Sequence, residues 1–88
     1  MQFQHYDLGI LSGGETVVVG LEGNAANVLL LDSNNFSTYR QKGTGYKYYG
    51  GHVQQSPFRI RVPHSGHWHV AIDLGGYGGT VKSTVRVV

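Results

Sequence analysis

The segment HSGHWH, residues 64–69, holds the side chains in this sequence that are best suited to bind a metal ion. Its histidines are His64, His67 and His69, and Asp73 follows four residues later. Alternate residues of a strand point to one face, so His67 and His69 can reach one zinc, nickel or copper ion, with His64 or Asp73 as third ligand. Paired histidines are a permissive pattern, however, and a solvated strand face also accounts for them. Taken alone, the pattern predicts no bound cofactor.

The same segment contains the residue types of a Ser, His and Asp catalytic set. Ser65 would be the nucleophile, but no nucleophile elbow or oxyanion-hole segment accompanies it, and a serine in PHSG is typical of a turn. His69 and Asp73 lie four residues apart, roughly 13 Å along a strand, which is too far for a base and its orienting carboxylate. The sequence therefore favours a protein that is not an enzyme.

The elements that must position these side chains are short strands. Seven segments are rich in β-branched or aromatic residues and are separated by turns that contain glycine or asparagine. They cover residues 3–8, 15–21, 27–32, 46–50, 57–62, 67–74 and 80–88. One short helical segment is expected at residues 33–41, with Ser33 as its cap. We predict a single all-β domain over residues 1–88, an antiparallel β-sandwich or flattened barrel of about seven strands.

Composition excludes several classes of protein. The absence of cysteine rules out disulfides and thiolate zinc sites, and fits a reducing compartment. The start of the chain lacks the pattern of a secretory signal, and no apolar run is long enough to span a bilayer. A formal charge of +2 is too mild to indicate a partner. We expect a cytoplasmic protein without a membrane segment.

Two hairpins are predicted to decide which side chains share a face. A three-residue loop closed by Gly66 would pair residues 57–62 with 67–74, placing Val62 opposite Trp68 and Arg61 opposite His69. Trp68, Val70 and Ile72 would then form the core side. A second hairpin through GGYGG would add the last strand. The solvated face would carry Arg59, Arg61, His67, His69, Asp73, Lys82 and Arg86. A cation beside His69 opposes metal binding.

Two further surfaces suggest ligands. Tyrosines beside glycine pairs offer rigid rings and close backbone approach, which suit a small ligand or a sugar. These candidates are Tyr46, Tyr48, Tyr49 and Tyr77. The alternative is weak nucleic-acid binding by a basic sheet face, with tyrosines available for stacking. Its residues are Arg59, Arg61, Lys82 and Arg86. Ordinary solvated sheets also carry such charges, so nucleic acid is the less favoured partner.

The N-terminal half contains two apolar runs without alternation, VVV at 17–19 and VLLL at 28–31. Both faces of these strands need cover. Phe36 and Tyr39 in the helical segment look too few to cover two strands. We therefore expect a homo-oligomer formed through the N-terminal half.

Residues 48–88 contain YYGG, then SP, then VP-x-SG-x-W-x-V-x-IDLGG and a valine-rich final strand. With VVV, NVLLLD and NF-x-x-Y nearer the start, the chain resembles a bacterial family known as domain of unknown function 1883. The resemblance implies a small β-domain without an assigned activity, so it transfers no residue roles. It also implies longer relatives that combine this domain with a TIR-type signalling domain. The sequence thus predicts an uncharacterised, non-catalytic binding or protein-interaction module.

Overall fold

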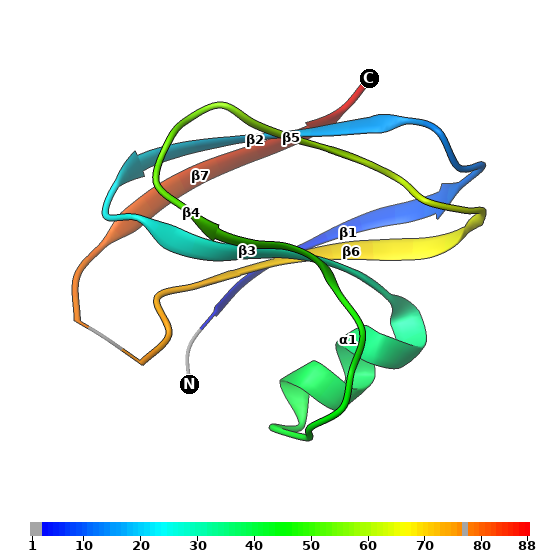
Figure 1. Cartoon of the computed structure of the whole chain (residues 1–88), viewed down its shortest axis with the longest axis horizontal. Coiled ribbons are helices and arrows are strands. Elements are labelled where there is room, and N and C mark those ends of the chain that lie inside the picture. Colours follow the sequence, from blue (N-terminus) through cyan, green and yellow to red (C-terminus); the bar gives the residue numbers. More distant parts are fainter. Residues whose placement is uncertain (1–2, 77) are drawn as a thin grey trace.

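The computed structural model describes residues 3–76 and 78–88, and its strands form two antiparallel sheets packed face to face (Figure 1). The four-stranded sheet has the order β1 (Phe3–Leu11), β6 (Gly66–Asp73), β3 (Ala26–Asp32), β4 (Tyr49–Val53). The three-stranded sheet has the order β5 (Phe58–Arg61), β2 (Thr16–Gly23), β7 (Val81–Val87). The one helix among the described residues, α1 (Ser33–Arg40), lies beneath the four-stranded sheet in Figure 1. The predicted all-β sandwich is confirmed.

Both predicted hairpins are wrong. β5 pairs with β2, and β6 pairs with β1 on one side and β3 on the other, so PHSG carries the chain from one sheet to the other. β7 also pairs with β2 rather than β6. A short loop with a glycine fits a hairpin and a crossover equally well. Six consecutive residues of β6 are buried, which fits a strand covered on both faces but does not select its partner strands.

The core lies between the sheets and includes the predicted phase of β6. Trp68, Val70 and Ile72 are each at most 1% exposed. They pack with Val62, which follows β5, and with alternate residues of β2 and β3, namely Val17, Val19, Val28 and Leu30. The inward placement of Trp68 is therefore confirmed although its predicted partner strand is not.

Helix α1 covers the other face of the four-stranded sheet. Phe36 and Tyr39 bury Leu29, Leu31 and Ala71 in a second apolar cluster. The N-cap is Asp32 rather than Ser33, because the Asp32 carboxylate accepts a hydrogen bond from Asn35 N at 2.9 Å. No helix among the described residues is long and apolar enough to cross a membrane.

The apolar runs are covered within the chain, which removes the reason for expecting self-association. The outer face of Leu29 and Leu31 lies under α1. Val18, on the outer face of the three-stranded sheet, is only 5% exposed and is flanked by Arg59 and Arg86. The aliphatic stems of such arginines can cover an apolar neighbour. A homo-oligomer stays a prediction, but these runs no longer support it.

Candidate metal site

A β-bulge in β1 brings an aspartate to the histidines of β6. Asp7 pairs with His69 and Gly9 pairs with Trp68, so the register shifts by one residue between them. Gly9 has a φ of +75° and donates its N–H to Asp7 Oδ1 at 2.9 Å. Bulges re-aim side chains and terminate regular pairing. This bulge holds the Asp7 carboxylate over the outer face of β6.

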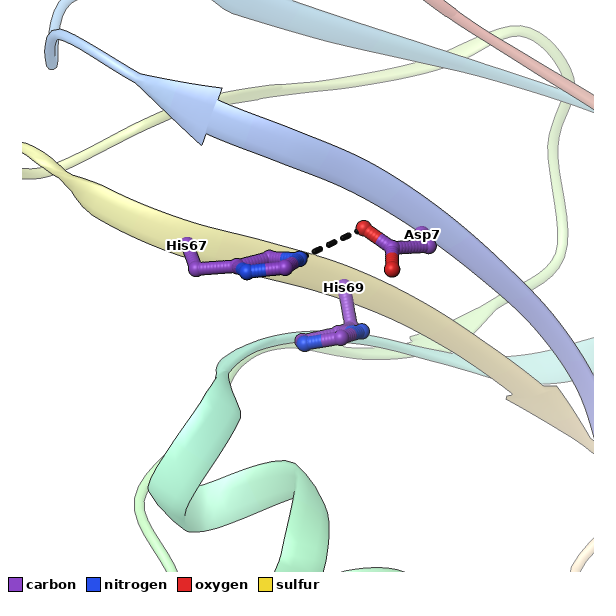
Figure 2. A group of neighbouring side chains, drawn as sticks. All are labelled: Asp7, His67 and His69. Atoms are coloured by element: carbon purple, nitrogen blue, oxygen red, sulfur yellow. Dashed lines mark hydrogen bonds and ion pairs between the residues drawn. The ribbon is translucent and has the colours of Figure 1, made fainter.

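Asp7, His67 and His69 form a compact group on that face (Figure 2). One donor atom from each residue lies within 4.8 Å of the other two. His67 Nε2 and Asp7 Oδ1 are 2.6 Å apart and form an ion pair when the imidazole is protonated. The His67 and His69 rings are stacked, with centroids 4.7 Å apart. His67 and Asp7 are accessible to solvent, whereas His69 is only 7% exposed.

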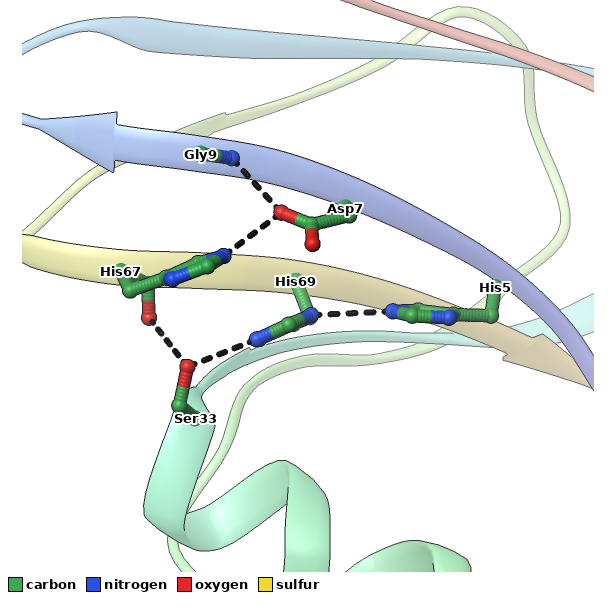
Figure 3. A network of polar contacts seen from close by, with 6 residues as sticks. All are labelled: His5, Asp7, Gly9, Ser33, His67 and His69. Carbon is green, nitrogen blue, oxygen red and sulfur yellow. Dashed lines mark hydrogen bonds and ion pairs between the residues drawn. The ribbon is translucent and has the colours of Figure 1, made fainter.

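A second layer of contacts fixes His69 (Figure 3). Its Nδ1 lies 2.9 Å from Nε2 of His5, and its Nε2 lies 2.8 Å from Ser33 Oγ at the start of α1. Phe36 stacks on the His5 ring at 4.2 Å and on the His69 ring at 4.7 Å. Both ring nitrogens of His69 are therefore partnered, and its plane is set by aromatic neighbours. Such outer contacts orient metal-ligating histidines.

The electrostatics favour an anionic carboxylate beside a neutral imidazole. The hydrogen bond from His67 holds the pKa of Asp7 below its usual value, and the Gly9 N–H lowers this pKa further. Burial lowers the pKa of His69 below its usual 6.5, because a charged imidazole is poorly solvated there. Neutral histidine and ionised carboxylate are the protonation states that metal ions require.

We expect the His69 shift to make the fold less stable in mild acid. Below about pH 6.5 the unfolded chain binds a proton at His69 that the folded chain does not bind. The free energy of unfolding should therefore fall as the pH drops from about 6.5, and level off below the folded pKa. Urea melts between about pH 7.5 and 5 measure this loss, and His69→Gln should flatten the profile. Parallel profiles for parent and variant would contradict the assignment.

Only two of the predicted metal ligands, His67 and His69, lie together in the structure. They share one face, but His64 lies exposed in the loop before β6 and packs on the Trp68 ring at a centroid distance of 5.0 Å. Asp73 is also excluded, because it is buried and accepts hydrogen bonds from Tyr39 OH at 2.5 Å and Asn27 Nδ2 at 2.8 Å. The third member, Asp7, was missed by sequence reasoning. The alternation of His5 and Asp7 before Gly9 is the signal that could have found it.

The predicted basic neighbour of His69 is wrong as well. Arg61 lies opposite Thr16 in the three-stranded sheet, so it belongs to the other layer of the sandwich. Asp73, His67 and His69 likewise do not share a face with the arginines. The objection to a metal at His69, which rested on this arginine, is therefore removed.

The tyrosine residues do not form one cleft. Tyr46 packs on Tyr39 and Tyr48 on the helix side, whereas Tyr49 contacts Trp68. Tyr77 lies outside the described residues. The nearby glycine loop lines an open cavity of about 570 Å³. Its other lining residues include Phe3, Gln4, Leu74 and Val81. Tyr46, Tyr48 and Tyr49 are not part of that lining.

A family model described as a domain of unknown function, DUF1883, matches residues 1–88. The chain belongs to this family. No curated protein and no solved structure matches the chain. The family description assigns no activity to the DUF1883 domain, so a function for this DUF1883 domain must be argued from its own geometry.

Proposed function

We propose that this DUF1883 domain is a non-catalytic module that binds one divalent transition-metal ion through Asp7, His67 and His69. The observation that carries the proposal is the convergence of three donor atoms within 4.8 Å of one another. Two imidazoles and one carboxylate suit zinc, nickel or copper better than magnesium or calcium, which prefer oxygen ligands only. Three protein ligands leave a further coordination position for water or a partner group.

The geometry needs two small changes to accept an ion. Donor atoms around tetrahedral zinc are roughly 3.3 Å apart, so the 2.6 Å contact between His67 Nε2 and Asp7 Oδ1 must widen. Stacked imidazoles cannot both aim an in-plane lone pair at one point, so one ring must turn about its Cβ–Cγ bond. His67 is the ring free to turn, since 40% of its side chain is exposed. His69 stays where His5, Ser33 and Phe36 hold it.

The contacts of His69 allow either of its ring nitrogens to coordinate the ion. If Nδ1 binds the ion, the hydrogen bond to His5 is replaced and Ser33 continues to orient the ring through Nε2. If Nε2 binds, the roles of His5 and Ser33 are exchanged. In both cases one outer hydrogen bond remains, and such contacts fix the tautomer of a ligating histidine.

Zinc titration of the untagged, metal-free protein by isothermal calorimetry tests the proposal. We expect one equivalent of Zn²⁺ to bind, and Asp7→Asn or His67→Ala to weaken binding by about 100-fold or more, because each removes a ligand. His64→Ala is the matched control, since it removes an imidazole three residues from His67 that faces Trp68. Absence of saturable binding, or equal losses in all three variants, would refute the metal site.

The remaining expectations from the sequence are retained as proposals. We propose a bacterial, cytoplasmic module that recognises a protein partner or a small ligand, for which the cavity beside the glycine loop supplies space. Its volume of about 570 Å³ is that of many ligand sites. Self-association also stays a proposal, and the apolar runs that suggested it are covered within the chain.

A further inference from the structure

The outer face of the three-stranded sheet carries a cluster of three arginines, Arg59, Arg61 and Arg86. Arg59 of β5 and Arg86 of β7 lie on either side of Val18 in β2, and Arg61 lies opposite Thr16. All three side chains are exposed. Lys82 lies on the same face, two alternate positions along β7 from Arg86 and opposite Glu22. We call Arg59, Arg61 and Arg86 the arginine patch.

The arginine patch has no acidic partner in the described part of the chain. The ion pair found there joins His67 and Asp7 on the opposite layer, and no carboxylate lies within 4 Å of an arginine guanidinium. Glu15, the nearest acid in sequence to Thr16, accepts hydrogen bonds from the backbone of Ser12 and Gly13 instead. The patch thus keeps its positive charge, which favours an anionic partner.

The patch is also uncovered. Helix α1 lies on the other side of the molecule, beyond the four-stranded sheet (Figure 1). Within the patch Val18 is only 5% exposed, and the exposed apolar side chain at its border is Val88, which pairs with Thr16. Proteins that bind a membrane surface insert aromatic or leucine side chains, and none is exposed here. The arginine patch therefore attracts a partner through its positive charge alone.

We propose that the arginine patch binds the phosphate backbone of nucleic acid without base preference. Guanidinium groups bind phosphate through two parallel hydrogen bonds, which ammonium groups cannot do. Alternate residues of a strand are about 7 Å apart and strands separated by one neighbour are about 10 Å apart, so the three groups can engage successive phosphates. Tyr46 and Tyr48 lie between α1 and β4, and Tyr49 lies in β4, so none of these three rings is placed beside the patch for base stacking.

Fluorescence anisotropy with a labelled oligothymidylate of about 20 nucleotides tests this inference. Three phosphate contacts predict a slope of about −2 to −3 for log K against log[salt]. Arg59→Gln with Arg86→Gln should lower affinity about tenfold or more and reduce the slope by about one per arginine. Lys42 and Lys47 are exposed residues between α1 and β4, on the helix side of the molecule. The control Lys42→Gln with Lys47→Gln therefore makes the same change of net charge away from the patch, and should leave affinity nearly unchanged.

Because Arg59 and Arg86 flank Val18, their replacement can also affect folding. The Arg59→Lys, Arg86→Lys variant keeps both charges and most of both stems, so it should retain the salt slope and bind more weakly than the parent. Equal losses in the patch and control variants, absence of oligonucleotide binding at low salt, or binding only to vesicles that contain phosphatidylserine would each overturn the inference. We expect zinc affinity to be unaffected by these changes, because the arginines lie in the other sheet, so this test is independent of the metal site.

Discussion

Replacing Trp68 with alanine should lower the free energy of unfolding by about 3 to 5 kcal/mol. Trp68 is 1% exposed and is among the largest fully buried side chains of the core between the two sheets. Its removal leaves a cavity that the rigid β6 backbone, paired on both sides, cannot close. A domain of 88 residues has a total stability of about 4 to 13 kcal/mol, so the loss is a large fraction of the whole.

Trp68→Phe separates the packing of this side chain from its hydrogen bond. The indole Nε1 donates to His64 O at 3.0 Å, across the loop that joins β5 to β6. Phenylalanine keeps a ring in the core but leaves that carbonyl without its donor, which should cost about 1 to 2 kcal/mol. Urea melts of both variants provide the measurement. Losses below about 1 kcal/mol for Trp68→Ala would show that the core does not depend on this residue.

The inward position of Trp68 was predictable because a strand's alternation does not depend on its partner. Any strand through residues 67–74 places Trp68, Val70 and Ile72 on one face, and their apolar character identifies that face as the core side. The partner of the strand is a different matter. Pairing β6 with β1 joins residues about 60 positions apart, and nothing local encodes that choice.

The candidate metal site illustrates the same limit. His67 and His69 share a face for local reasons and were therefore found as a pair. Asp7 joins them only because β1 pairs with β6 and a bulge follows at Gly9. The false neighbour, Arg61, came from the wrong hairpin. A single error in strand pairing thus replaced a carboxylate with a cation and reversed the electrostatic argument about metal binding.

The sequence predicted that the outer faces of β2 and β3 are covered, but not which side chains cover them. Continuous apolar runs correctly indicated that both faces of β2 and β3 are buried. They could not show what covers them, because the cover depends on where α1 docks and on long side chains from neighbouring strands. Phe36 and Tyr39 are enough to cover the outer face of β3, since the neighbouring strand β6 adds only the small side chain of Ala71 to the apolar surface there. On β2 only Val18 needs cover, because Gly20 is the next residue in that phase.

Strand β4 begins later than the sequence predicted and depends on a glycine at its second residue. The strand expected at residues 46–50 instead spans Tyr49–Val53 and includes Gly50 and Gly51, paired with Leu29 and Val28. Gly50 has a φ of +118°, and a Cβ there would overlap the carbonyl oxygen of Val28. Gly51 has a φ of +149°, but a Cβ there would meet nothing within 4 Å. Substitutions at these two glycines therefore separate the cost of a positive φ from the cost of overlap with a neighbouring backbone.

Gly50→Ala should therefore lower the free energy of unfolding by about 3 to 5 kcal/mol, whereas Gly51→Ala should cost only about 1 to 2 kcal/mol. Both substitutions force an L-residue into a positive φ, but only the first drives a methyl group into backbone that cannot rotate away. Relief requires β4 to move away from β3, which would break the hydrogen bonds of an edge strand and expose Leu29 and Val53. Urea melts measure the difference, and amide exchange of the β3 and β4 residues should report it locally. Equal costs for the two alanines would mean that β4 shifts freely and that the close approach of Gly50 to Val28 contributes nothing to stability.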